Sequence, residues 1–119
     1  MNDNERDMPE DADEAAPAQT TWPTTPSARR KARRFAVQAL YTWQISGEPP
    51  YAIEAYYRAE NDLRKTDAVY FGELFREVIA RADALDAAFS PFLDRPLRDL
   101  DPIEKAILRI GVYELQHRI

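Results

Sequence analysis

The stretch ARRKARRFAVQALYTWQIS, residues 28–46, decides the fold because it predicts one long amphipathic helix. Each residue of an α-helix advances by about 100° around the axis. This step places Arg30, Arg34 and Tyr41 on one stripe of the helix. An aromatic and aliphatic set lies on the other side: Phe35, Ala39 and Trp43. The stretch therefore predicts a helix with one side in the core and an outward side of cations and an aromatic ring.

The start of this helix has five basic residues: Arg29, Arg30, Lys31, Arg33 and Arg34. Cations at this position oppose the helix dipole, so helix stability does not explain them. Guanidinium groups match phosphate oxygens and stack on bases. Together with Tyr41 in phase, the run predicts a binding site for single-stranded nucleic acid. Two alternatives stay open for the basic run, a localisation signal and a solubilising cluster. Tyr41 has an alternative of its own, a residue at the border of the core.

The net charge of −5 is distributed unevenly along the 119 residues. The first 28 residues contain seven acids against Arg6, whereas residues 29–119 contain 15 basic and 14 acidic groups. The acidic balance of the whole chain therefore does not exclude a nucleic-acid ligand. Residues 1–27 are also rich in Pro, Ala and Thr, with Trp22 as their only aromatic residue. We expect residues 1–27 to be a disordered acidic tail and residues 28–119 to be one helical domain.

The composition excludes several classes of protein. Cysteine is absent, which excludes disulfides and thiolate chemistry. No run approaches the roughly 18 apolar residues of a membrane span. The acidic N-terminus also lacks the basic and apolar regions of a secretory signal. We expect a cytoplasmic protein without membrane contact.

The remainder of the domain is predicted to be helical almost throughout. The first helix has Ser27 as its N-cap and ends before Gly47, which suits the left-handed position after a helix. A short helix follows over residues 51–61. Thr66 or Asp67 then opens a long helix that ends near residue 89, with apolar residues at every third or fourth position.

The last helix begins with a capping box, in which Asp101 is the N-cap and Glu104 is the third helical residue. The helix is apolar around most of its circumference and leaves only a thin polar strip: Lys105, Arg109 and Gln116. A helix of this kind needs neighbours on several sides. We expect the chain to be a shortened form of a longer protein, or to be completed by a partner or by self-association.

Residues typical of catalytic or metal sites are few. His117 is the only histidine, and no ligand residue lies in phase with it. The three glycines are too scattered for a phosphate loop, and no serine has a neighbouring base. Glu114 lies over a stripe of isoleucines and must find a partner, which predicts a buried structural pair rather than catalysis. We expect no enzyme, no cofactor and no metal.

Three stretches resemble the NusB family of bacterial transcription antitermination factors: ARRKARRFAVQALYTWQIS (28–46), DAVYFGELFREVI (67–79) and DPIEKAILRIGVYEL (101–115). The resemblance covers about Ala28 to Leu115. It implies an all-α fold of two small bundles packed together. The family's chain continues into further helices that complete the second bundle, so we expect this second bundle to be incomplete here.

The resemblance also implies a function. Members of the family bind the boxA element of ribosomal RNA leader transcripts alongside NusE, a small-subunit ribosomal protein. The pair helps RNA polymerase to read through terminators. By position, residues 29–34 fall where the family meets RNA. Tyr41 and Glu104 fall where the family contacts its protein partner, near the RNA edge.

Two other functions stay open at this point. A similar module precedes the catalytic part of some rRNA cytosine methyltransferases, where it is an accessory RNA-binding domain. Those enzymes continue for hundreds of residues into a cofactor-binding domain. The sequence downstream of Ile119 would therefore distinguish a methyltransferase from an antitermination factor. The third alternative is a helical protein-interaction domain without a role in RNA binding.

Overall fold

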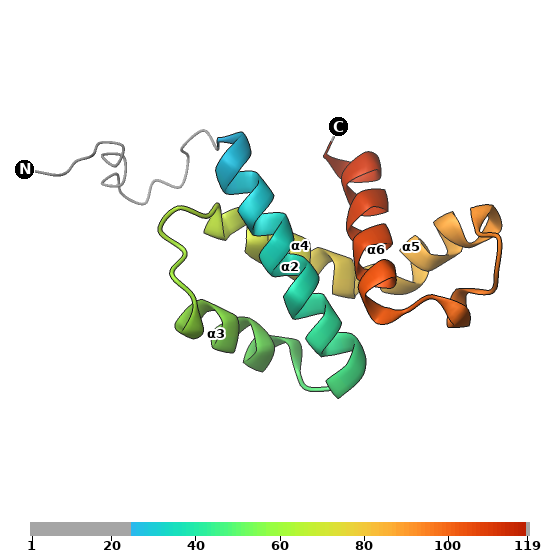
Figure 1. Cartoon of the computed structure of the whole chain (residues 1–119), viewed down its shortest axis with the longest axis horizontal. Helices are drawn as coiled ribbons and strands as arrows, with labels where there is room; N and C mark the ends of the chain where they lie inside the picture. The colour runs from blue at the N-terminus through green and yellow to red at the C-terminus, as the bar shows by residue number, and fades with distance from the viewer. Residues whose placement is uncertain (1–24, 119) are drawn as a thin grey trace, which may run out of the picture.

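The computed structural model describes residues 25–118, and every regular element within them is a helix (Figure 1). The predicted all-α fold is therefore confirmed. The elements in chain order are α2 (Pro26–Ser46), α3 (Pro50–Glu60), α4 (Ala68–Ala80), α5 (Ala82–Phe89), the 3₁₀ helices η2 (Ser90–Phe92) and η3 (Leu97–Asp99), and α6 (Pro102–His117). The part of the predicted acidic tail over residues 1–24 lies outside the described residues.

Helix α2 begins earlier than predicted. Thr25 is its N-cap, and the Thr25 hydroxyl oxygen accepts a 3.0 Å hydrogen bond from the N–H three residues later. Pro26 is the first helical residue, a position where its missing N–H needs no partner. The predictions of Ser27 as the cap and of residues 26–27 as tail are therefore wrong. The other end is as predicted, because Gly47 is left-handed with φ 72°.

Helix α2 is the central element of the fold and packs mainly against α4 and α6, with α3 on a further side (Figure 1). Its buried face consists of small and medium side chains: Ala32, Ala36, Ala39 and Leu40. Helix α4 supplies the largest fully buried side chains, Phe71 and Phe75, whose rings stack with centroids 6.2 Å apart. Phe35 of α2 meets Phe71 edge-on at 6.5 Å. The first helix therefore organises the core, as its pattern predicted.

The single long helix predicted over residues 67–89 is two helices. Asp67 caps α4 as predicted, with its carboxylate accepting from the N–H of Tyr70 at 3.0 Å. The chain then leaves the helical conformation at Arg81, where φ is −111° and ψ is 14°. This break turns α5 away from α4, so that α5 packs against α6 (Figure 1). No glycine or proline lies at the break, so the sequence had no local signal for it.

Helix α6 begins with the predicted capping box. The Asp101 carboxylate accepts from the N–H of Glu104 at 2.8 Å, and the Glu104 carboxylate accepts from the N–H of Asp101 at 3.3 Å. Both bonds satisfy N–H groups that the first turn of a helix leaves unpaired. The start of α6 is therefore determined by local chemistry.

The predicted polar strip of α6 is wrong at Arg109, which is buried with 7% exposure. Its guanidinium donates two hydrogen bonds to the Asp86 carboxylate, at 2.8 and 2.7 Å. A third donor reaches the Gln44 side-chain oxygen at 3.0 Å. Buried charge is tolerated when it is paired and hydrogen-bonded in this way. Arg109 thus joins α6 to α5 and α2 inside the molecule.

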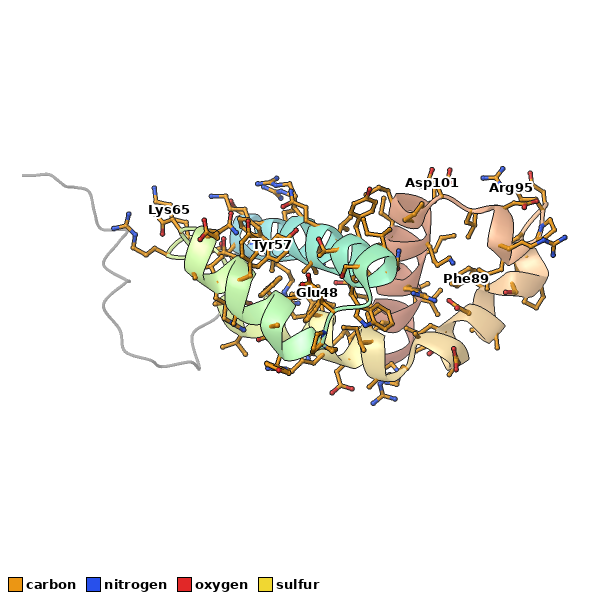
Figure 2. All side chains as sticks on the ribbon, turned by 90° about the horizontal axis from the view of Figure 1, so that it is seen from below. Glu48, Tyr57, Lys65, Phe89, Arg95 and Asp101 are labelled. Atoms are coloured by element: carbon orange, nitrogen blue, oxygen red, sulfur yellow. The ribbon has the colours of Figure 1, made fainter. Side chains whose placement is uncertain are left out.

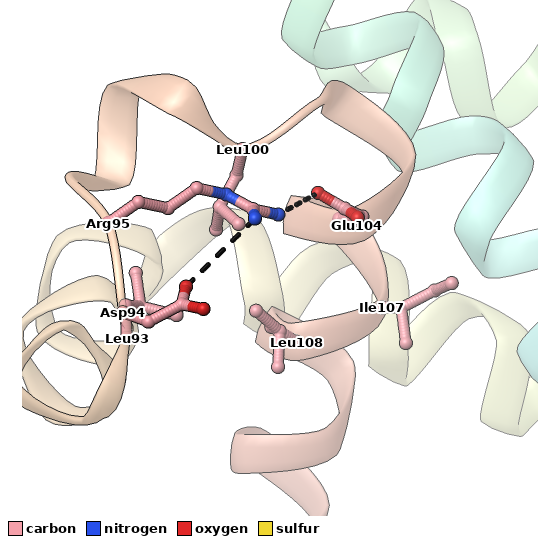
Figure 3. Close-up of a pocket in the computed structure, with 7 residues that line it drawn as sticks. All are labelled: Leu93, Asp94, Arg95, Leu100, Glu104, Ile107 and Leu108. Carbon is pink, nitrogen blue, oxygen red and sulfur yellow. Dashed lines mark hydrogen bonds and ion pairs between the residues drawn. The ribbon is translucent and has the colours of Figure 1, made fainter.

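Several apolar groups of α6 are exposed, as expected for a helix with too few neighbours. Ile103, Ile107 and Leu115 are 42%, 53% and 66% exposed. Ile110, in contrast, is buried in the core. A groove of about 320 Å³ lies beside α6 and is lined by Leu93, Asp94, Arg95, Leu100, Glu104, Ile107 and Leu108 (Figure 3). Self-association through these apolar groups stays a prediction.

Candidate nucleic-acid interface

The five predicted basic residues differ in exposure along the first turns of α2. Arg30 and Arg34 are exposed, whereas Arg29, Lys31 and Arg33 are half-buried. The helical step explains the division, because residues 30 and 34 lie one turn apart on the side away from the buried alanines. The exposed stripe predicted from the sequence is therefore present for both arginines.

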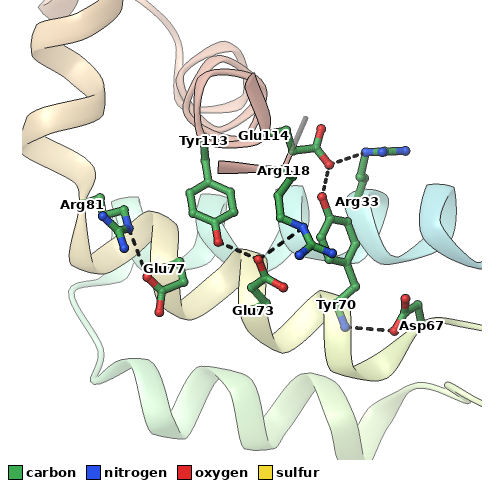
Figure 4. Close-up of polar contacts among 9 residues, drawn as sticks. All are labelled: Arg33, Asp67, Tyr70, Glu73, Glu77, Arg81, Tyr113, Glu114 and Arg118. Carbon is green, nitrogen blue, oxygen red and sulfur yellow. Dashed lines mark hydrogen bonds and ion pairs between the residues drawn. The ribbon is translucent and has the colours of Figure 1, made fainter. Parts of the chain in front are cut away.

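Arg33 is bound to the body of the molecule rather than projecting freely from it. Its Nε donates to the Glu114 carboxylate at 2.7 Å, and the Tyr70 hydroxyl donates to the same carboxylate oxygen (Figure 4). The hydrogen bond with Glu114 raises the pKa of Arg33. Burial, followed by the bond to Glu114, raises the pKa of Tyr70 to about 12. The prediction that Glu114 finds a structural partner is confirmed, but the predicted burial of the pair is wrong, because the Arg33 and Glu114 side chains are 40% and 21% exposed.

Arg29 also contacts Tyr70. Its guanidinium carbon lies 4.3 Å from the centroid of the Tyr70 ring, a distance typical of a cation–π contact. The Arg29 Nε is buried and has no hydrogen-bond partner among residues 25–118. Tyr70 therefore supports two arginines of the run, one through its ring and one through the carboxylate that its hydroxyl contacts.

The two residues predicted to contact a protein partner lie on α2 and α6. Tyr41 is half-buried, and the Glu104 side chain is 45% exposed and forms a 3.1 Å ion pair with Arg95. Gln44, one turn after Tyr41, donates a 2.7 Å hydrogen bond to the Pro102 carbonyl at the start of α6. This bond joins the two helices close to both residues. Tyr41 and Glu104 therefore belong to the same end of the α2–α6 pair.

The sequence reasoning missed two basic residues that the fold brings near the start of α2. The first is Lys65, which is exposed in the loop before α4. The N–H of Asp67 donates to the Ala28 carbonyl at 3.3 Å and so ties this loop to α2. Figure 2 shows Lys65 at the opposite end of the molecule from Arg95. The second is Arg118, whose guanidinium carbon lies 5.2 Å from the Tyr70 ring centroid.

Other kinds of site find no support in the described part of the chain. Residues 25–118 contain no group of three or more His, Asp or Glu side chains that could hold a metal ion. The ring of His117 stacks on Tyr113 with centroids 5.0 Å apart, which is a structural contact. No helix within residues 25–118 combines the length and the apolar character that a bilayer span requires.

Comparison with known proteins identifies the family. The family model described as "NusB family" matches residues 30–119. This chain belongs to the NusB family. The match includes all of α3 to α6 and most of α2, so the NusB family fold accounts for nearly the whole described structure.

Curated NusB relatives agree with this assignment. The protein named transcription antitermination protein NusB of Idiomarina loihiensis is 53% identical over 94 residues, which cover 79% of this chain and 68% of the relative. The protein of that name from Alcanivorax borkumensis is 49% identical over 96 residues, or 81% and 64% of the two chains. The one from Pasteurella multocida is 50% identical over 93 residues, or 78% and 65%. The chain spans about two thirds of the length of these relatives.

Proposed function

We propose that this chain is a non-catalytic, RNA-binding antitermination factor of the cytoplasm. It binds the boxA element of ribosomal RNA leader transcripts together with NusE and works within the antitermination complex of RNA polymerase. The relatives from Idiomarina and Alcanivorax are named transcription antitermination proteins, which supports this role. The observation that carries the RNA-binding part is the exposure of Arg30 and Arg34 on one stripe of a helix whose opposite face is buried.

The RNA would bind along the start of α2. Arg30 and Arg34 are one turn apart, and Tyr41 follows two turns after Arg34, about 10 Å farther along the axis. Guanidinium groups there neutralise phosphates, and the tyrosine ring offers a face to a base. The exposed Lys65 adds a further cation beside the helix start. This combination favours a flexible single strand, whose bases are free to stack on protein side chains.

NusE would bind at the other end of α2, where Tyr41 and Glu104 belong to neighbouring helices. The exposed Ile103 and Ile107 lie on the same helix as Glu104 and offer apolar surface for burial in an interface. Glu104 adds a carboxylate that is 45% exposed at the rim of this surface. A partner with an apolar patch and a neighbouring cation fits this surface.

Fluorescence anisotropy with a boxA-like single strand tests the proposal. If about four phosphates are neutralised, the logarithm of the binding constant should fall against the logarithm of salt concentration with a slope near −3. The double variant R30A/R34A should bind more weakly. Its slope should be shallower by about 1.4, because two phosphate contacts disappear. Addition of NusE should tighten binding of the unmodified protein.

The matched control is R76A/R98A, which removes two exposed arginines outside α2. Both double variants should keep the helicity and the unfolding transition of the parent. Equal loss of RNA affinity in the two variants would mean that the chain binds RNA through overall charge alone. A salt slope near zero for the parent would contradict RNA binding through phosphates.

A further inference from the structure

The fold brings an arginine from the end of α6 beside the arginine-rich start of α2. Arg118 and Arg29 are far apart in sequence, yet their guanidinium carbons lie 5.2 and 4.3 Å from the centroid of the same Tyr70 ring. Tyr70 is itself 2% exposed, so its ring is a fixed support. Figure 4 shows Arg118 between Glu73 and the Tyr70 ring, with Arg33 and Glu114 at the Tyr70 hydroxyl. Two helices therefore supply cations to one corner of the molecule.

Three arginines gather around Tyr70 at this corner. Its cations are Arg29, Arg33 and Arg118, and the carboxylates that pair with them are Glu114 and Glu73. The pairing of Arg118 is loose, with its Nε 3.5 Å from the Glu73 carboxylate. The same Glu73 oxygen accepts a much shorter bond, 2.6 Å, from the Tyr113 hydroxyl. The long ion pair leaves the charge of Arg118 only weakly neutralised, which favours an additional anion.

The arginines at the corner retain donors for such an anion. Arg33 donates its Nε to Glu114, and its side chain remains 40% exposed. The Arg118 side chain is 37% exposed. Both guanidinium groups are held on one side, by Glu114 and by the Tyr70 ring, and open to solvent on the other. Such contacts restrict the two side chains before an anion binds, which lowers the entropy cost of binding.

We propose that Arg118, together with Arg29 and Arg33, forms a binding corner for a phosphodiester of single-stranded RNA. The corner extends the RNA surface of α2 onto the end of α6, and the inference rests on the proposed RNA-binding function. Arg118 and Arg33 contact the phosphate oxygens. Tyr70 is a positioning residue that holds Arg29 and Arg118 over its ring. RNA then crosses from one helix to the other instead of following α2 alone.

Glu114 has a defined part in this corner, because it competes with the phosphate for Arg33. A ligand must offset the 2.7 Å ion pair before it gains the full donor capacity of Arg33. Neutralisation of Glu114 should therefore strengthen RNA binding. The variant E114Q keeps an acceptor oxygen for the Tyr70 hydroxyl while it removes the competing charge.

The test compares R118A with R98A in the full chain, using anisotropy with the same single-stranded RNA at several salt concentrations. Arg98 is an exposed arginine of η3, which precedes α6, so the two sites are separated by the length of α6, about 24 Å. R118A should weaken binding about threefold to fivefold, as for one partly exposed charge pair. It should also make the salt slope shallower by about 0.7, the value for one phosphate contact. R98A should change neither quantity, and E114Q should bind more tightly.

A variant that retains the charge controls for folding. R118K should recover part of the affinity and most of the salt slope, since lysine binds phosphate as a point charge. An unchanged affinity and slope for R118A would overturn the proposal, and weaker binding by E114Q would overturn the competition at Arg33. If R30A/R34A loses affinity while R118A does not, the corner fails and the proposed function stands. If R30A/R34A also binds normally, the proposed function itself fails.

Discussion

Arg33 and Arg34 are neighbours in the same basic run, yet the fold gives them different surroundings. Arg34 is exposed, whereas Arg33 donates to Glu114 at 2.7 Å across the α2–α6 contact. Arg30 and Arg29 differ in the same way, because Arg30 is exposed and Arg29 lies on the Tyr70 ring. A step of about 100° separates the members of each pair. The basic run therefore divides between two faces of the helix. One face is exposed to solvent, and the other contributes to tertiary contacts.

The largest effect is expected where an arginine is paired completely inside the molecule. Arg109→Ala should lower the free energy of unfolding by about 3–5 kcal/mol, because it leaves the Asp86 carboxylate, whose side chain is only 13% exposed, without its cation. Chemical denaturation measures the change, with the exposed Arg98→Ala as the control. A loss below about 1 kcal/mol would show that water or another group replaces the guanidinium.

A comparison within the basic run separates its two surfaces directly. Arg33→Ala should lower the free energy of unfolding by about 0.5–1 kcal/mol, because the ion pair with Glu114 is partly exposed to solvent. Arg34→Ala should leave it unchanged while weakening RNA binding. Thermal unfolding and anisotropy on the same two variants provide the measurements. Equal stability of the two variants would contradict the structural role given to Arg33.

Glu104→Lys examines the partner end of the same helix pair. It should weaken association with NusE more than association with RNA, because it reverses a charge at the proposed partner surface. It also places a cation in the first turn of α6, which should cost only about 0.3–1 kcal/mol of stability. Glu60→Lys, an exposed reversal at the end of α3, is the matched control. Unchanged NusE affinity in a folded E104K variant would leave Glu104 as a capping residue only.

The smallest effect concerns the acidic N-terminal sequence, which has seven acids within its first 14 residues. Deletion of residues 1–24 leaves the cap Thr25 in place and should tighten binding to random RNA at low salt. The reason is that these acids compete with RNA for the exposed cations of α2. The difference should fade near 0.15 M salt, where the screening length is about 8 Å. Identical affinities of the two chains at low salt would exclude the competition.

Local signals predicted much of the fold. Gly47 and the capping box of Asp101 and Glu104 lie where the sequence placed helix ends, because a cap depends on residues within one turn. The break at Arg81 had no such signal and follows from the packing of α5 on α6. Arg109 was assigned to solvent because periodicity alone cannot show that Asp86 and Gln44 lie opposite it. The Thr25 cap was missed because Ser27 is an equally good capping residue type.

The candidate site divides in the same way. The exposed stripe of Arg30 and Arg34 could be predicted, because helical geometry alone separates it from the buried alanines. The need of Glu114 for a partner could also be predicted, but not which residue would supply it. Arg118 could not be found at all, since its place beside Arg29 depends on the way α6 packs against α2 and α4.

The sequence by itself determined that the chain is helical, where most helices begin or end, and that a dense run of arginine opens the first one. These properties depend on interactions within a few residues. Only the tertiary structure decided which of those arginines also pair with other helices. Arg33 meets a carboxylate 81 positions later in the chain, and a contact over that distance is determined by helix packing, not by the local pattern.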